Sequence, residues 1–127
     1  MEATVIVTFL VLAQYVLFGI QVGEMRVKHG VKGPATTGHE EFERMNRVHQ
    51  NTMEQIVLFL PALWIHAQYA NPLWGAALGL VFIVGRFVYR AEYLKDPGSR
   101  SPGFSMSFIP SAVLLIWALI AAVLRLL

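Results

Sequence analysis

Four apolar stretches alternate with polar segments along the chain, over residues 3–22, 56–70, 73–88 and 104–127. A helix that crosses a membrane needs about 20 mostly apolar residues, and each stretch comes close to that length. The pattern therefore predicts an all-α integral membrane protein that folds as a bundle of four transmembrane helices. Since the sequence shows no internal repeat or low-complexity segment, residues 1–127 are expected to form a single domain.

Short polar motifs predict where the helices begin and end. Residues 37–40, Thr-Gly-His-Glu, have the pattern of a capping box that opens the second helix well before its apolar part. Asn71, followed by a proline, is a typical N-cap for the third helix, and Asp96 with the next Pro-Gly is expected to end it. Ser101, again before a proline, opens the fourth helix in the same manner.

Polar residues recur on one face of the second helix. Arg44, Arg47, Asn51 and Glu54 are spaced by three, four and three residues, which places them in a row along a helix. The apolar part that follows, residues 56–70, is 15 residues long. It measures about 22 Å at about 1.5 Å per residue, against a hydrocarbon core of about 30 Å. The polar row is therefore expected to dip below the membrane surface.

The third helix repeats this pattern with Arg86, Tyr89 and Tyr93. Because neighbouring helices of the bundle run antiparallel, the two polar faces are expected at the same membrane depth, where they predict a pocket. The excess of arginine favours an anionic ligand, since guanidinium groups grip carboxylates, and Glu54 could receive an ammonium group. For Glu54 alone, an internal ion-pair network with Arg47 and Arg86 that merely joins helices is an equally good interpretation.

Composition and charge define the environment of the bundle. Hydrophobic residues make up 56% of the chain and charged residues 14%, and the mean hydropathy is +0.55, which is too apolar for an ordinary soluble domain. Nine of the ten Lys and Arg residues lie within residues 26–47 or 86–100, the two connections on one side of the bundle. The positive-inside rule predicts that this side is cytoplasmic. The sequence does not distinguish a bacterial inner membrane from the endoplasmic reticulum.

Residue types exclude several kinds of chemistry. Cysteine is absent, so any thiol chemistry must use the thiol of a cosubstrate. His29 and His39 are expected on the loop surface and His66 in an apolar stretch, without convincing metal-ligand spacing. We therefore expect no metal site. Nothing in the sequence resembles a Ser-His-Asp triad, a phosphate-binding loop or a nucleic-acid platform, and no nucleic-acid partner is expected.

The segment 41–54, Glu-Phe-Glu-Arg-Met-Asn-Arg-Val-His-Gln-Asn-Thr-Met-Glu, resembles the second-helix signature of the MAPEG family. These are membrane-associated proteins of eicosanoid and glutathione metabolism. The match extends without a gap from Arg26 to Arg100, most closely to the glutathione-conjugating members. It implies a homotrimer with glutathione bound between neighbouring subunits. It also implies a membrane-bound transferase that conjugates glutathione to lipophilic electrophiles, and leaves peroxidase activity on lipid hydroperoxides open.

The resemblance also assigns site residues. The positions at which the family holds glutathione are occupied here by Arg47, Asn51, Glu54, Tyr89 and Tyr93, and an adjacent subunit would contribute Arg26 and His49. Arg100 matches the arginine that activates the thiol, and further candidates for ligand contact are Arg44, Arg86 and Arg90. A thiol with a pKa of about 8.5 is mostly protonated at neutral pH, and a guanidinium that keeps its charge can stabilise the thiolate.

Two positions depart from the family pattern. Family members often have Gln at the position of His49 and Tyr at that of Gln55. These departures lie near the expected pocket, so they leave the identity of the electrophile open. They bear less on the binding of glutathione itself.

Two other classes of protein are alternatives. One is a non-catalytic lipid-binding member that resembles five-lipoxygenase-activating protein, whose pattern lacks counterparts of Arg47, Glu54 and Arg100. The other is a small multidrug exporter, which should carry a carboxylate in the middle of its first helix. Residues 3–22 contain none. The arginines and the glutamate therefore favour the enzyme.

Overall fold

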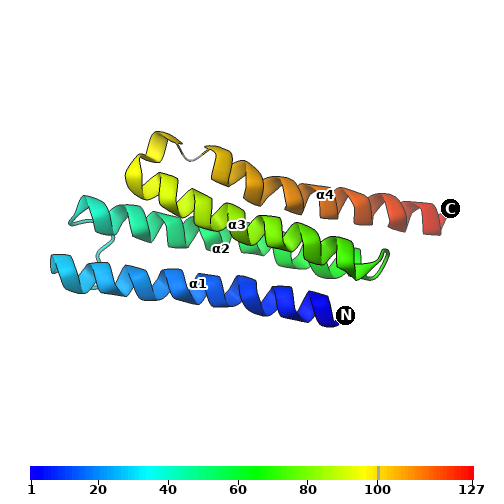
Figure 1. The fold of residues 1–127 in the computed structure, drawn as a ribbon, viewed down its shortest axis with the longest axis horizontal. Helices are drawn as coiled ribbons and strands as arrows, with labels where there is room; N and C mark the ends of the chain where they lie inside the picture. Colours follow the sequence, from blue (N-terminus) through cyan, green and yellow to red (C-terminus); the bar gives the residue numbers. More distant parts are fainter. Residues whose placement is uncertain (100) are drawn as a thin grey trace.

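The computed structural model describes residues 1–99 and 101–127 and contains four long helices (Figure 1). They are α1 (Glu2–His29), α2 (Glu40–Ala67), α3 (Pro72–Lys95) and α4 (Ser101–Leu126), with a short 3-10 turn, η1 (Pro97–Ser99), before α4. Successive helices run in opposite directions, so both termini lie at one end of the bundle. The predicted all-α bundle is confirmed, and so are the predicted boundaries at Asn71 and Asp96. α4 begins with Ser101 as its first helical residue, one position earlier than an N-cap at Ser101 implies.

Three helical segments within the described residues are long and apolar enough to cross a membrane: α1, α3 and the segment that contains α4. This is the pattern of an integral membrane protein. α2 is as long as α1, with 28 residues, but it carries the polar row from Arg44 to Glu54 and is less apolar than these three segments. α2 packs against each of the other three helices. Its own crossing of the membrane stays a prediction.

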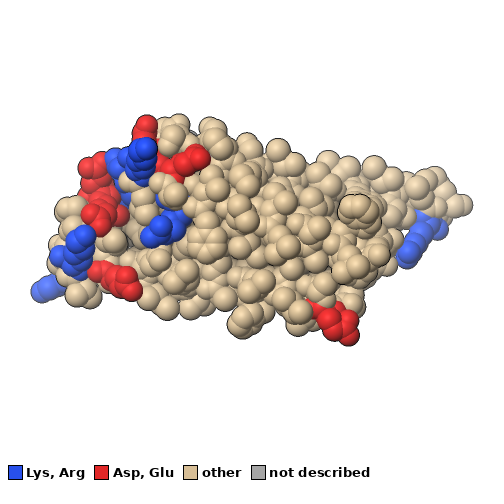
Figure 2. Space-filling model, in the orientation of Figure 1, with Lys and Arg blue, Asp and Glu red and all other residues tan. Residues whose placement is uncertain are grey.

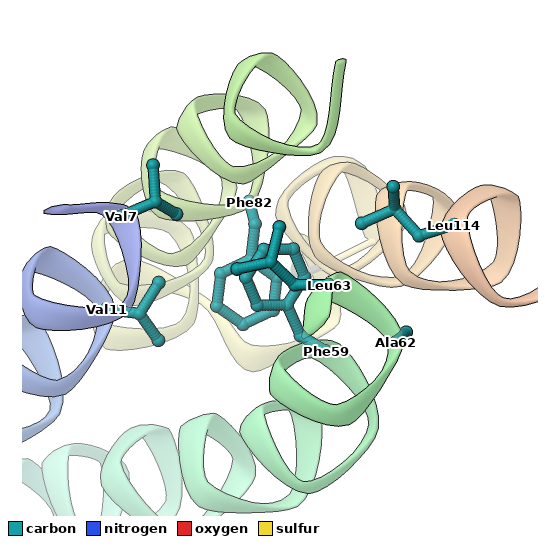
Figure 3. Packing of buried hydrophobic residues seen from close by; sticks show 7 residues of the cluster. All are labelled: Val7, Val11, Phe59, Ala62, Leu63, Phe82 and Leu114. Atoms are coloured by element: carbon teal, nitrogen blue, oxygen red, sulfur yellow. The ribbon is translucent and has the colours of Figure 1, made fainter. Parts of the chain in front are cut away.

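The half of the bundle nearer the termini, here called the apolar half, is held by close helix packing (Figure 3). Its core consists of Val7, Val11, Phe59, Ala62, Leu63, Phe82 and Leu114, drawn from all four helices. Two glycines of α3 let the helices approach: a Cβ on Gly79 would lie 2.4 Å from Val7 Cγ1, and one on Gly75 would lie 2.9 Å from Leu63 Cδ1. This pair of glycines therefore serves packing within the chain.

The opposite half, here called the charged end, carries most of the charged side chains (Figure 2). They gather where the α1–α2 and α3–α4 connections lie, as the distribution of Lys and Arg predicted. Beneath them is a second core cluster, which consists of Phe18, Val22, Val31, Phe42, Met45, Val48 and Tyr89. The side of the membrane that this end faces stays a prediction.

The capping box predicted over residues 37–40 is wrong in its register, because the N-cap of α2 is His39. Its Nδ1 accepts a hydrogen bond from the Glu41 N–H at 3.1 Å, and the Glu43 carboxylate accepts one from the Gly38 N–H at 3.0 Å. Gly38 has a φ of 145°, in the positive region that favours glycine. The helix therefore cannot extend back through Gly38 towards Thr37.

Candidate functional site

A pocket of about 500 Å³ opens at the charged end. Its walls are Arg47 and Asn51 of α2, Tyr89 and Tyr93 of α3, and Ser101, Phe104 and Ser105 of α4. The sequence predicted that the α2 and α3 members of this set belong to one ligand site, and the structure brings these four side chains together. We call this cavity the polar pocket.

Glu54 lies one helical turn beyond Asn51 and is linked to two residues of the polar pocket. Arg47 Nη1 lies 3.5 Å from Glu54 Oε1, and Asn51 Nδ2 donates a hydrogen bond to the same oxygen at 3.3 Å. The Arg47 and Glu54 side chains are 44% and 52% exposed. An exposed ion pair contributes only about 0–1 kcal/mol to stability, so a ligand can replace this contact at little energetic cost.

Arg86 lies behind the polar pocket and is fully buried. Its Nη2 donates hydrogen bonds to Asn51 Oδ1 at 2.8 Å and to Thr52 Oγ1 at 3.0 Å. Its Nε donates to Thr52 Oγ1 at 3.2 Å, and its Nη1 to Ser107 Oγ at 3.2 Å. In the part of the chain that the structure describes, no salt bridge joins Arg86 to Glu54. The sequence left open an ion-pair network in which Glu54 binds both Arg47 and Arg86. Among the described residues, the pair with Arg47 is present and the pair with Arg86 is not.

Two stacked tyrosines form the α3 wall of the polar pocket. The Tyr89 ring is 2% exposed and stacks on Tyr93, with centroids 5.5 Å apart and planes inclined by 15°. The Arg86 guanidinium lies 4.4 Å from the Tyr89 ring centroid. α4 passes directly against this backbone, because a Cβ on Gly103 would lie 2.3 Å from Tyr89 N. Gly103 therefore brings the α4 wall against the tyrosine wall.

Two residues predicted for the site lie away from the polar pocket of the same subunit. Arg26 Nη1 donates to the Ala35 carbonyl at 2.8 Å, and its guanidinium lies 4.6 Å from the Phe42 ring centroid. The His49 ring stacks on Tyr15 with centroids 4.3 Å apart. Arg26 of α1 thus contacts α2, and His49 of α2 contacts α1, so both residues lie between these two helices. The sequence assigned both of them to a neighbouring subunit.

The candidates Arg44 and Arg90 also tie helices together and do not line the polar pocket. Arg44 Nη1 donates to the Leu94 and Lys95 carbonyls at 2.9 and 3.2 Å, which are among the carbonyls left unpaired at the end of α3. Arg90 Nε donates to Gln21 Oε1 of α1 at 2.8 Å. In the structure these two arginines connect α3 with its neighbours.

The remaining candidate, Arg100, lies outside the described residues. Sequence reasoning missed the α4 wall, Ser101, Phe104 and Ser105, because the fourth helix was considered only as an apolar span. A signal was present, since these residues are spaced by three and one and share a helical face. Among the described residues, no group of three His, Cys, Asp or Glu side chains could hold a metal ion.

Fold and pocket together define a class of protein: a small helical membrane protein with a polar pocket at one end of its bundle. The sequence profile of the MAPEG family matches residues 4–120, and the chain belongs to that family. The match covers α2 and α3 completely, and with them every described wall of the polar pocket. The resemblance seen in the second-helix segment is thereby confirmed.

Individual relatives extend over most of the chain. An uncharacterised protein of Synechocystis sp. is 41% identical over 116 residues, which are 91% of this chain and 85% of the relative. Microsomal glutathione S-transferase 2 of Homo sapiens is 40% identical over 101 residues, or 80% of this chain and 69% of the relative. Leukotriene C4 synthase of Cavia porcellus is 35% identical over 119 residues, or 94% and 75%. The human relative is named as a glutathione S-transferase, the kind of family member that the sequence resembles.

Proposed function

We propose that this protein is a membrane-bound glutathione transferase that conjugates glutathione to lipophilic electrophiles. The observation that carries the proposal is the polar pocket itself, in which Arg47, Asn51, Tyr89 and Tyr93 line one cavity with Glu54 beside it. Further support comes from the relatives, among them a glutathione S-transferase and a leukotriene C4 synthase.

The charges of the site complement those of glutathione, a tripeptide with two carboxylates and one ammonium group. Arg47 offers a guanidinium that can grip a carboxylate through two parallel hydrogen bonds. Glu54 offers a carboxylate to the ammonium group. Behind them, the buried Arg86 adds a positive charge, and the side chains that accept its hydrogen bonds, Asn51, Thr52 and Ser107, are all neutral. The site is thus net positive, which favours an anionic ligand.

Arg100 is proposed to stabilise the glutathione thiolate. Each unit by which the thiol pKa falls requires about 1.4 kcal/mol of preferential thiolate stabilisation, which is within reach of one desolvated guanidinium. The thiolate sulfur then attacks the electrophilic carbon and forms a C–S bond. The leaving group departs with the electron pair of the broken bond, and the thiol proton goes to solvent. The chain has no cysteine, so the only thiol in this step is that of glutathione.

The proposed assembly is a homotrimer in which all four helices cross the membrane and the charged end faces the cytoplasm. In that arrangement Arg26 of α1 and His49 of α2, which lie where these two helices pack together, belong to the boundary with a neighbouring subunit. Native mass spectrometry of the detergent-solubilised protein should show a trimer. A fully active monomer would contradict a site shared between subunits.

The proposed activity is tested by adding glutathione and a standard aryl halide to the purified protein and following conjugate formation. Arg100→Ala should bind glutathione as the wild type does but form less thiolate near neutral pH, with turnover partly restored at higher pH. Arg100→Lys should retain partial activity, since it keeps the charge without the planar fork. Wild-type thiolate and turnover in both variants would contradict the assignment of Arg100.

The same preparation distinguishes the alternatives. Turnover of a lipid hydroperoxide with oxidation of glutathione would add a peroxidase activity to the proposal. Binding of a fatty acid without any binding of glutathione would instead indicate a lipid-presenting protein similar to five-lipoxygenase-activating protein, and the transferase proposal would then be wrong.

A further inference from the structure

We propose that Arg86 is a positioning residue, which holds Asn51 and Tyr89 in the geometry that glutathione requires without contacting the ligand itself. This inference rests on the proposed function. Arg86 is fully buried and does not line the polar pocket, yet its guanidinium contacts two residues that do. Its sequence position alone suggested a direct ligand contact, and the structure points to an indirect role.

The contact with Asn51 fixes which way its side-chain amide faces. Arg86 can only donate hydrogen bonds, so the Asn51 oxygen must point towards Arg86, at 2.8 Å from Nη2. The Asn51 amino group then points the other way, where it donates to Glu54 Oε1 at 3.3 Å. The polar pocket is thereby supplied with a hydrogen-bond donor at this position, as an anionic ligand requires.

The remaining contacts hold three helices around the same guanidinium. Thr52 of α2 accepts two of its hydrogen bonds, and Ser107 of α4 accepts a third. The Ser107 hydroxyl in turn donates to the Gly103 carbonyl at 2.9 Å, at the point where α4 passes against Tyr89. One side chain of α3 therefore sets the relative position of the α2, α3 and α4 walls.

Helix adhesion alone does not explain a cation at this position. A buried charge in a membrane bundle is energetically costly, and apolar residues of similar volume often stabilise a fold at least as well. Arg44 and Arg90 also join helices, but they do so nearer the exposed end of α3. Arg44 bonds to the Leu94 carbonyl and Arg90 to Gln21, and neither partner is a wall of the polar pocket. The buried guanidinium is set apart by its contacts to Asn51 and Tyr89.

The test is the affinity of purified, trimer-sized protein for S-hexylglutathione, which has no free thiol, so that thiolate formation does not enter the measurement. Arg86→Lys keeps the charge but cannot reach Asn51, Thr52 and Ser107 together. We expect its dissociation constant to rise about tenfold, which equals about 1.4 kcal/mol. In conjugation assays the KM for glutathione should rise by a similar factor, while kcat at saturating glutathione stays within about twofold.

The matched control is Gln14→Met. Gln14 is also buried and also ties two helices, because its Nε2 donates to the Ile83 carbonyl at 2.9 Å, but it lies outside the polar pocket. Its variant should bind S-hexylglutathione as the wild type does. Equal weakening in both variants would indicate general loosening of the bundle and would overturn the positioning role.

A second variant keeps the inference testable if Arg86→Lys does not fold. Thr52→Val leaves Arg86 in place and removes the acceptor of two of its hydrogen bonds. We expect this variant to bind S-hexylglutathione about threefold more weakly than the wild type. Wild-type affinity in Thr52→Val, or in a folded Arg86→Lys, would overturn the inference. If the wild-type protein itself binds no S-hexylglutathione, the proposed function is wrong. If the wild type binds and the variants bind equally well, only the positioning role of Arg86 is wrong.

Discussion

The apolar half and the charged end of the same four helices are held together by different forces. In the apolar half, stacked rings such as Phe59 and Phe82 and the glycines of α3 give close packing. Some buried polar groups there are unpaired: neither ring nitrogen of His66 has a hydrogen-bond partner among the described residues. At the charged end, Arg44, Arg86 and Arg90 each bond to another helix.

This difference shows where a binding site can be built. Packed apolar side chains determine how closely helices approach but offer a polar ligand no directional contact. Hydrogen bonds between helices fix the orientation of particular donors and acceptors, as Arg86 does for Asn51. We therefore expect the apolar half to stabilise the bundle and the charged end to select the ligand. Substitutions in one half should change stability, and substitutions in the other should change binding.

The largest effect is expected at Gly103, where both roles meet. In Gly103→Ala the added Cβ would lie 2.3 Å from Tyr89 N and 2.4 Å from its Cα, backbone atoms that cannot move aside. The loss of stability should reach or exceed the upper end of the about 1–3 kcal/mol typical of overpacking, and ligand binding should be lost with it. Thermal unfolding in detergent measures the first effect and titration with glutathione the second.

The control for Gly103 is Gly23→Ala in α1, since a Cβ at Gly23 would meet no atom within 4 Å. Alanine is the better helix former by about 1 kcal/mol, so this variant should be as stable as the wild type or slightly more so. Equal losses in both glycine variants would show that helix flexibility, rather than the contact between α3 and α4, is what matters.

Gly79→Ala should separate stability from binding. Its Cβ would lie 2.4 Å from Val7 Cγ1 in the apolar half. Valine is stiff about its first side-chain torsion, so the helices must shift, and a loss of about 1–3 kcal/mol in thermal unfolding is expected. The dissociation constant for glutathione should stay within about twofold of the wild type. A large loss of affinity would contradict the independence of the two halves.

His66→Leu should make the apolar half more stable. The His66 side chain is fully buried and packs edge-on against Trp117, with ring centroids 4.4 Å apart and planes inclined by 77°. An unsatisfied buried polar group costs about 1–3 kcal/mol, and leucine removes that penalty while it loses the ring contact. A net gain of about 1 kcal/mol in thermal unfolding and unchanged turnover are expected. Lost turnover would show that His66 has a role in function.

The smallest effect concerns Glu41 at the α1–α2 connection. The hydrogen bond from Lys28, and the charges of Lys28 and His29, lower the pKa of Glu41 below its ordinary value of 4.5. A lowered pKa in the folded state means that the stabilisation is complete above pH 4.5 and is lost as the pH falls through the lowered pKa. Amide protection over residues 30–39 should fall in that window. Glu41→Gln should lack this step, and an identical pH profile would contradict the assignment.

Much of the fold was predictable because it depends on local signals. Stretches of apolar residues and the polar motifs at Asn71, Asp96 and Ser101 are properties of neighbouring residues. The N-cap of α2 was not predictable in the same way. Both Thr37 and His39 can cap a helix, and the positive φ of Gly38, which decides between them, is a property of the folded loop.

The candidate site was predictable only in part. Helical spacing places Arg47 and Asn51 on one face, and likewise Tyr89 and Tyr93. Helical spacing also groups Arg86 with the tyrosines, but the burial of its side chain depends on how closely α4 approaches α3. That approach is determined by Gly103, 17 residues further along the chain. Contacts between helices of this kind leave no periodic signal in the sequence.

Calorimetric titration of the purified protein with glutathione shows whether the polar pocket at the charged end binds this tripeptide. The wild type should bind, and Arg47→Ala and Glu54→Ala should each lose about 1.5–3 kcal/mol, or about 10- to 100-fold in affinity. Arg125→Ala removes a cation that lies over Tyr69 at the opposite end and should bind normally. Binding that is unchanged in both pocket variants, or absent in the wild type, would contradict the proposed glutathione site.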